Sequence, residues 1–135
     1  MRVLADTCVW SEALRRRRGV ESSVVIEFRN LILEHRIDII GPIRQEILSG
    51  LRENTQFEKL ENHLAAFPDI PLETADYIMA AKFFNACRAK GVQGSNTDFL
   101  ICAVAVQRQL AIYTTDKDFN LYAKYLPIVL YETRG

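Results

Sequence analysis

Short, continuous apolar segments alternate along the chain with longer segments in which apolar residues recur every three or four positions. A continuous apolar segment is typical of a strand covered on both faces, and the recurring pattern is typical of a helix with one buried face. The predicted strands are residues 2–5, 37–40, 110–116 and 128–131, with 69–72 as at most a short edge strand. The predicted helices are residues 10–14, 24–35, 41–51, 55–67, 74–90, a helix beginning near 96, and a short one at 119–122.

This alternation, without a tight hairpin between consecutive strands, indicates a parallel sheet with helices on both faces. We therefore predict an α/β fold, a three-layer α/β/α sandwich with a central parallel sheet of four to five strands. At 135 residues the chain is expected to form a single domain, residues 1–135. Local signals mark some helix ends: Gly41-Pro42 predicts a start, Thr55 with Glu58 a capping box, and Gly91 an end.

Composition narrows the class of protein. Hydrophobic residues make up 49% of the chain, and the formal net charge is +0, so any phosphate-binding surface has to be a local patch. The three cysteines, Cys8, Cys87 and Cys102, lack metal-ligand spacing and are odd in number, which favours a reducing cytoplasm over a disulfide framework. No apolar segment approaches the roughly 20 residues of a membrane span, so no membrane partner is expected.

Four acidic residues stand out by their positions in this pattern. Asp6 follows the first predicted strand, Asp116 ends the third, and Asp98 lies in the first turn of an otherwise apolar helix. Because the carboxyl ends of parallel strands meet at one edge of a sheet, we expect Asp6 and Asp116 to be neighbours there. Glu46 lies beside the buried face of its helix, one turn before a glycine, so its side chain can project into an open cleft.

Each acid also has a purely structural interpretation. Asp98 can form a capping box with Ser95, Glu46 can be an ordinary exposed helix residue, and Asp116 can be a turn residue. Asp6 is the hardest to explain in this way, because a carboxylate directly after a buried strand loses hydration and needs a partner.

Taken together, the four acids call for a joint explanation. Like charges brought close together repel and raise one another's pKa, and few lysines or arginines lie near these positions. A divalent cation would neutralise the charges, and an all-oxygen site with room for water suits Mg²⁺ or Mn²⁺. The two histidines, His35 and His63, lie on helical stripes and are predicted to be packing residues rather than ligands.

Four motifs in order carry a family resemblance. They are Val-Leu-Ala-Asp-Thr around Asp6, Ile-Arg-Gln-Glu-Ile around Glu46, Asn-Thr-Asp-Phe-Leu-Ile-Cys-Ala-Val-Ala around Asp98, and Tyr-Thr-Thr-Asp-Lys-Asp-Phe around Asp116. Each motif alone is weak, but the set in this order and spacing resembles the PIN-domain family over residues 3–119, and in particular the VapC toxins of bacterial and archaeal toxin–antitoxin pairs.

The resemblance implies a PIN-like fold and a metal-dependent endoribonuclease. Its Mg²⁺ (or Mn²⁺) would be held by Asp6, Asp98 and Asp116, with Glu46 as a fourth acid. Thr114 matches the family's hydroxyl residue two positions before the last acid. The metal would lower the pKa of a bound water, and Glu46 or Asp116 would orient or deprotonate that water. Products with 5′-phosphate and 3′-hydroxyl ends are expected.

One residue departs from the family pattern, and one basic segment has two interpretations. Cys8 stands where serine or asparagine is commoner, which weakens a polar contact beside Asp6 without removing a ligand. Arg15, Arg16, Arg17 and Arg18 follow Asp6 by about two helical turns. They are either a solvated helix end or a patch that binds RNA phosphates near the mouth of the site.

The resemblance also implies partners. These are an RNA substrate, a cognate VapB-like antitoxin that blocks the acidic site, and a second copy of the chain in a homodimer. The exposed part of the first two helices, near residues 24–32, is the predicted groove for an antitoxin segment or for the homodimer contact. Trp10, by contrast, is predicted to lie in the core.

Two other classes of protein compete with this interpretation. A receiver domain also carries an acidic Mg²⁺ pocket, but it needs paired acids after the first strand and a phosphorylatable aspartate at a central strand, whereas the second strand here ends in Gly41. A PIN-like module that has lost activity and only binds partners is the other. Retention of all four acids disfavours it, because clustered carboxylates without a partner are costly.

Overall fold

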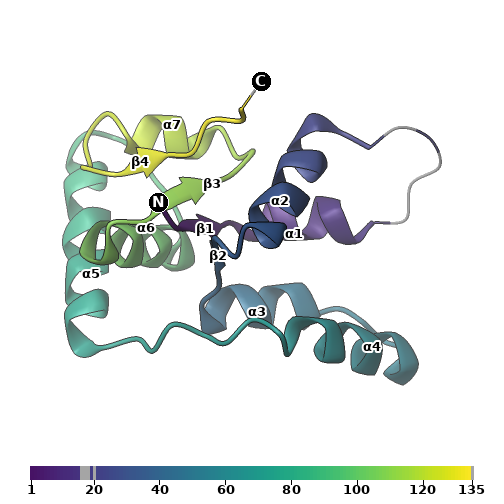
Figure 1. Cartoon of the computed structure of the whole chain (residues 1–135). Coiled ribbons are helices and arrows are strands. Elements are labelled where there is room, and N and C mark those ends of the chain that lie inside the picture. Colours follow the sequence, from purple (N-terminus) through teal and green to yellow (C-terminus); the bar gives the residue numbers. More distant parts are fainter. Residues whose placement is uncertain (16–18, 20, 135) are drawn as a thin grey trace.

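The computed structural model describes residues 1–15, 19 and 21–134, and it has the predicted layers (Figure 1). Within the described residues, four strands form one parallel sheet in the order β2-β1-β3-β4. Their bounds are Val3–Ala5 for β1, Ile37–Asp38 for β2, Ala111–Tyr113 for β3 and Val129–Leu130 for β4. In Figure 1, α5 and α6 lie to one side of the sheet and α1 and α2 to the other, so the α/β/α prediction is confirmed.

The helices follow the predicted periodicity, with shifts at their ends. Their bounds are Thr7–Leu14 for α1, Ser23–Leu33 for α2, Gly41–Leu48 for α3, Asn54–Leu64 for α4, Thr74–Ala89 for α5, Asn96–Arg108 for α6 and Asp118–Tyr122 for α7. Helix α6 is buried from Phe99 to Ala105 and packs against α5 and β3. This burial explains why its sequence is apolar on almost every side, since a helix covered all round has no polar face.

The sheet pairs β1 with both of its neighbours and so makes it the central strand. Val3 aligns with Ile37 on one side and with Ala111 on the other, and all three β1 residues are fully buried. The backbone N–H of Asp6 still donates to the carbonyl of Tyr113 at 2.9 Å, so the pairing of β1 with β3 extends to the first acid. A single bridge between Ile39 and Asp69 is all the pairing at the predicted edge segment.

Several local predictions were wrong. The capping box of Thr55 and Glu58 does not form, because α4 begins one residue earlier, with Glu53 at its N-cap position and no side-chain cap. His35 follows α2 with φ +56° and is exposed, as is His63, so neither is a packing residue. The third strand is shorter than predicted, and Asp116 lies three residues beyond its end.

Trp10 lies in the core, as predicted. Its ring contacts Phe28 and Phe67 edge to face, with centroids 4.8 and 5.2 Å apart, and only 3% of the residue is exposed. These contacts attach α1 to α2 and to the segment after α4, and thereby fix the helix that begins at Asp6.

Candidate active site

The first acid, Asp6, is the N-cap of α1 and comes directly after the central strand. Its Oδ1 accepts a hydrogen bond from the Thr7 N–H at 2.8 Å, and its Oδ2 accepts one from the Thr114 hydroxyl at 2.9 Å. The Cys8 thiol also lies 3.4 Å from Oδ2 and 3.4 Å from the Thr114 hydroxyl. The thiol therefore keeps the polar contact expected at this position, at the longer distance that sulfur requires.

Thr114 joins the first acid to the last. While its hydroxyl donates to Asp6, the same oxygen accepts the N–H of Asp116 at 3.0 Å. Asp116 in turn uses Oδ1 to accept the N–H of Asp118 at 2.9 Å, at the start of α7. The loop after β3 is thus folded so that it presents Asp116 on the same side as Asp6.

The fourth acid, Glu46, reaches the cluster from α3. Its Oε2 accepts a hydrogen bond from the Thr7 hydroxyl at 2.8 Å, one residue from Asp6. Unlike Asp6, which is 6% exposed, Glu46 is an exposed residue. We call Asp6, Glu46, Asp98 and Asp116 the acidic group. Within it, Glu46 faces solvent and Asp6 is buried.

Asp98 lies in the first turn of α6. Its N–H donates to the Ser95 hydroxyl at 3.1 Å, so the predicted N-cap is present. Its carboxylate has a separate partner: the Tyr122 hydroxyl donates to Oδ2 at 2.9 Å. Ser95 therefore caps α6 through the backbone N–H of Asp98, and a weaker interaction of Ser95 with the Asp98 carboxylate adds to the hydrogen bond from Tyr122.

Electrostatics shows that three of these acids lie close together. Burial raises the pKa of Asp6, hydrogen bonds led by the one from Thr114 oppose that shift, and the charge of Asp116 adds to it. Burial likewise raises the pKa of Asp98, the hydrogen bond from Tyr122 opposes the shift, and the charges of Asp6 and Asp116 raise it further. Within the described residues, no arginine, lysine or histidine forms an ion pair with any of the three.

The donor atoms at this group are all oxygen and carry excess negative charge, the chemistry that a hard divalent cation requires. No three histidine, cysteine, aspartate or glutamate side chains in the described ranges stand close enough together to hold one metal ion directly. A cation that keeps part of its water shell, as Mg²⁺ does, would need fewer direct carboxylate ligands, and Asp6, Asp98 and Asp116 are the residues that would hold it.

Of the predicted basic segment the structure describes Arg15, and it does not bring this residue to the acids. Arg15 is the C-cap of α1, exposed, and separated from Asp6 by the length of the helix, roughly 12 Å. The other members of the predicted patch, Arg16, Arg17 and Arg18, lie outside the described residues. For Arg15 itself, a helix end in solvent describes the observed position.

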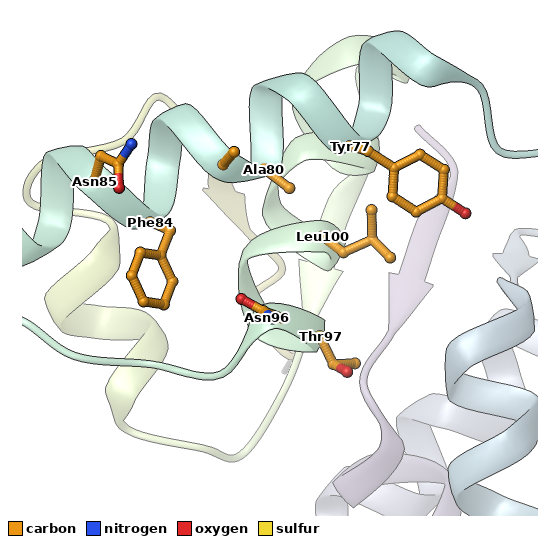
Figure 2. A pocket seen from close by; sticks show the side chains of 8 residues that line it. Tyr77, Ala80, Phe84, Asn85, Asn96, Thr97 and Leu100 are labelled. Atoms are coloured by element: carbon orange, nitrogen blue, oxygen red, sulfur yellow. The ribbon is translucent and has the colours of Figure 1, made fainter.

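A cavity of about 410 Å³ lies between α5 and α6 (Figure 2). Its lining is mainly apolar, with Phe84 from α5 and Leu100 from α6, and it includes the side chains of Asn96 and Thr97. These two residues directly precede Asp98 in the first turn of α6. None of the four acids lines the cavity, so it is distinct from the acidic site.

Comparison with known proteins agrees with this fold. Residues 3–125 match the PIN domain, so the chain belongs to the PIN-domain family. Two curated relatives are 32% identical over 126 residues, which is 90% of this chain and 92% of theirs: VapC ribonuclease Mb1587 of Mycobacterium bovis and ribonuclease VapC11 of Mycobacterium tuberculosis. The resemblance seen in the sequence is thereby confirmed.

Solved structures show the same fold at lower identity. A chain of FitAcB from Neisseria gonorrhoeae superposes with a TM-score of 0.77 and 22% identity, covering 97% of both chains. A chain of VapBC2 from Rickettsia felis, solved with a DNA fragment from its promoter, gives a TM-score of 0.75 and 19% identity over the whole of both chains. At these identities the structures support the fold alone.

Two residues of this group were missed in the sequence. Thr7 connects Glu46 to the segment of Asp6, and Tyr122 contacts Asp98 from a helix 24 residues away. A signal for Tyr122 was present: it lies one turn after Phe119 on a buried stripe, and a buried tyrosine hydroxyl needs a polar partner. Nothing in the local pattern indicated which partner that would be.

Proposed function

We propose that this chain is the toxin of a toxin–antitoxin module and acts as a metal-dependent endoribonuclease, with residues 1–135 forming one PIN domain. The observation that carries the proposal is the group of carboxylates at the carboxyl edge of the sheet, two of them with pKa values raised by burial and mutual repulsion. The ribonuclease names of relatives 32% identical over 90% of the chain support the same reaction. RNA is therefore the proposed substrate.

Asp6, Asp98 and Asp116 would hold Mg²⁺ or Mn²⁺ at this edge. The bound cation supplies charge neutralisation at the scissile phosphate and a water of lowered pKa. Thr114 fixes the orientation of Asp6 and the position of Asp116 through its two hydrogen bonds. Asp6 is thus held in one rotamer before any ligand arrives, which lowers the cost of ordering it on binding.

Glu46 is the proposed base. It is exposed and hydrogen-bonded to Thr7, so it faces solvent beside the buried acids and can accept a proton from water there. His35 and His63 do not serve this role: His35 lies at the opposite edge of the sheet, where its carbonyl accepts from Arg2, and His63 is on α4. Hydrolysis by water rather than attack by the 2′-hydroxyl is therefore proposed, with 5′-phosphate and 3′-hydroxyl products.

The partners follow from the same proposal. A solved toxin–antitoxin complex from Klebsiella pneumoniae shares the fold with a TM-score of 0.63, and we infer that this chain likewise pairs with a VapB-like antitoxin. Ile26 and Leu33 on α2 are 48% and 76% exposed, so the predicted groove near residues 24–32 has apolar surface for an antitoxin segment or for a second copy in a homodimer. Within the described residues, no helix is long and apolar enough to cross a membrane. The free thiols Cys8, Cys87 and Cys102 support a reducing cytoplasm as the compartment.

Purified protein incubated with structured RNA tests the reaction. Cleavage is expected with Mg²⁺ or Mn²⁺, none with EDTA, and the products should accept ligation as 5′-phosphates without prior kinase treatment. Asp118→Asn serves as a matched control, because Asp118 is an exposed acid two residues after Asp116, at the start of α7. RNA that stays intact in every metal, while an antitoxin still binds the protein, would favour the inactive binding module instead.

A further inference from the structure

Tyr122 is a fully buried tyrosine whose hydroxyl donates a hydrogen bond to a carboxylate of the acidic group. It lies on the short helix α7, is 0% exposed, and donates to Asp98 Oδ2 at 2.9 Å. Burial, and then the hydrogen bond to Asp98, raise the pKa of the Tyr122 hydroxyl above its ordinary value.

The ring has little freedom to move. It packs against Phe119 and Phe99, with ring centroids 5.1 and 4.9 Å away. On a third side lies the backbone of Gly94, in the loop before α6. A Cβ atom built on Gly94 would overlap the Tyr122 hydroxyl, and it would lie 2.8 Å from the Cζ atom of the ring. Two aromatic rings and a missing side chain thus fix where the hydroxyl stands.

We propose that Tyr122 is a positioning residue for the metal ligand Asp98, and that Gly94 is the position that makes room for it. This inference rests on the proposed function. Asp6 is oriented by Thr114 and by the N–H of Thr7, whereas Asp98 lies at the start of a separate helix and depends on Tyr122 for the same purpose. Tyr122 thereby attaches α7, the helix that follows Asp116, to the carboxylate of α6.

The physical reason is that a ligand carboxylate binds a cation well only when its rotamer is fixed before binding. Partners that hydrogen-bond to ligating groups typically contribute about 10–100-fold to metal affinity or activity. A hydroxyl that served packing alone would satisfy its donor equally well on a backbone carbonyl. The Tyr122 hydroxyl instead contacts a carboxylate of the acidic group, as a positioning role requires.

The test is Tyr122→Phe, which removes the hydroxyl and keeps the ring. Direct Mn²⁺ binding is measured by the loss of the free-ion signal in electron paramagnetic resonance, alongside RNA cleavage and a thermal melt in EDTA. We expect Mn²⁺ affinity to fall about 10-fold. Tyr125→Phe is the matched control: Tyr125 is a tyrosine three residues on, 44% exposed, and its substitution should leave binding and cleavage unchanged.

A second variant, Gly94→Ala, disrupts the hydrogen bond between Tyr122 and Asp98 without changing either residue. It leaves every polar side chain in place but displaces the Tyr122 hydroxyl, so Mn²⁺ affinity should again fall. The double variant with Tyr122→Phe should bind no more weakly than Gly94→Ala alone, because both changes remove one interaction. Since Gly94→Ala keeps the tyrosine, it decides the matter if Tyr122→Phe fails to fold.

The outcomes separate this inference from the proposed function. If the wild type binds no Mn²⁺, the metal site itself is overturned, and the role of Tyr122 with it. If the wild type binds Mn²⁺ and both variants bind it equally well, the metal site stands and Tyr122 is only a packing residue. Weaker binding in both variants, with unchanged binding in Tyr125→Phe, supports the positioning role.

Discussion

Two sets of buried carboxylates in this protein are treated in opposite ways. Glu27 and Asp76 are 3% and 1% exposed, and each forms a salt bridge with an arginine. Asp6 is almost as deeply buried, at 6%, and Asp98 is half-buried, yet no basic side chain among the described residues pairs with either. The fold therefore has the means to neutralise a buried acid, and it does not use them at the carboxyl edge of the sheet.

The carboxylates paired with arginine, Glu27 and Asp76, connect distant segments of the chain; we call them the paired set. Arg108 holds both oxygens of Asp76, at 2.6 and 2.9 Å, and so connects the end of α6 to the start of α5. Arg134 contacts both oxygens of Glu27 from the C-terminal segment, and the Tyr131 hydroxyl adds a further hydrogen bond at 2.9 Å. These bonds lower the pKa of Asp76 and lower that of Glu27 to about 2.

The unpaired set shows the reverse shift. Burial raises the pKa values of Asp6 and Asp98, and their only compensation comes from neutral donors such as Thr114 and Tyr122. Neutral donors orient a carboxylate without cancelling its charge, and the remaining charge can still attract a cation. The raised pKa values of Asp6 and Asp98 therefore belong to carboxylates whose charge stays uncancelled, whereas the lowered values of Glu27 and Asp76 belong to salt bridges between distant segments.

The largest expected effect comes from Asp98→Asn. The change keeps the shape and an acceptor for Tyr122 but weakens the attraction for the metal, so RNA cleavage should fall roughly 10²–10³-fold, equivalent to about 3–4 kcal/mol in the barrier. Asp118→Asn should cleave normally. The readout is the initial rate at saturating Mg²⁺. A variant that melts early in EDTA yet still cuts RNA would make Asp98 a structural residue and erase the contrast between the two sets.

Much of this contrast was accessible from the sequence, because it depends on local pattern. Asp6 follows a three-residue buried strand and Asp98 opens an apolar helix, and such positions place both acids at one edge of a parallel sheet. Thr114 could be identified as well, since it lies two residues before Asp116 in a motif of the family.

The paired set could not be predicted in this way. Glu27 and Arg134 are separated by 107 residues, and Asp76 and Arg108 by 32, so no local periodicity relates them. The same limit applies to Tyr122 and Asp98. The two histidines and the capping box of Thr55 show the converse error: a local pattern was present, but the chain left the helix before His35 and began α4 at Asn54. Contacts between distant segments decided the two salt bridges and the partner of Tyr122.

Arg108→Met should break the paired set. It removes the cation from Asp76 but leaves the donors Gln107 and the N–H of Glu73, so a buried carboxylate remains partly unsatisfied. We expect a loss of about 2–3 kcal/mol in the free energy of unfolding, from urea denaturation at neutral pH. Arg88→Met, an exposed arginine in the last turn of α5, is the control and should change stability little. Adding Asp76→Asn to Arg108→Met should restore part of the loss. An Arg108→Met protein as stable as the control would mean that this pair contributes nothing.

Magnesium should raise the melting temperature only through the unpaired carboxylates, which include Asp6 and Asp98. A cation that binds the folded state alone stabilises it by about 1.4 kcal/mol at ten times its dissociation constant, which for a chain of this size raises the melting temperature by about 4 °C. The wild type and Arg108→Met should both show this rise, although they start from different stabilities. Asp98→Asn should not. Melting curves recorded with Mg²⁺ and with EDTA supply the comparison, and an equal rise in all three proteins would place the cation elsewhere.

The smallest effect, and the most specific, is the dependence of stability on pH without metal. Burial raises the folded pKa of Asp98 above its ordinary value of 3.8, so ionising this group costs folding free energy once the pH exceeds 3.8, and costs nothing well below it. Asp98→Asn in EDTA should therefore be more stable than the wild type by roughly 1 kcal/mol or less at pH 7, and this gain should vanish as the pH falls below 3.8.

The pKa shift of Glu27 has the opposite sign. The hydrogen bonds from Arg134 lower its folded pKa to about 2, below its ordinary value of 4.5, so its contribution to stability is full above pH 4.5 and is lost as the pH falls toward 2. Glu27→Gln should accordingly destabilise the protein at pH 7 and matter progressively less in acid. Urea midpoints of the three proteins between pH 3 and 7 measure both slopes, and slopes of the same sign would show that the two sets of carboxylates do not differ in the way their surroundings indicate.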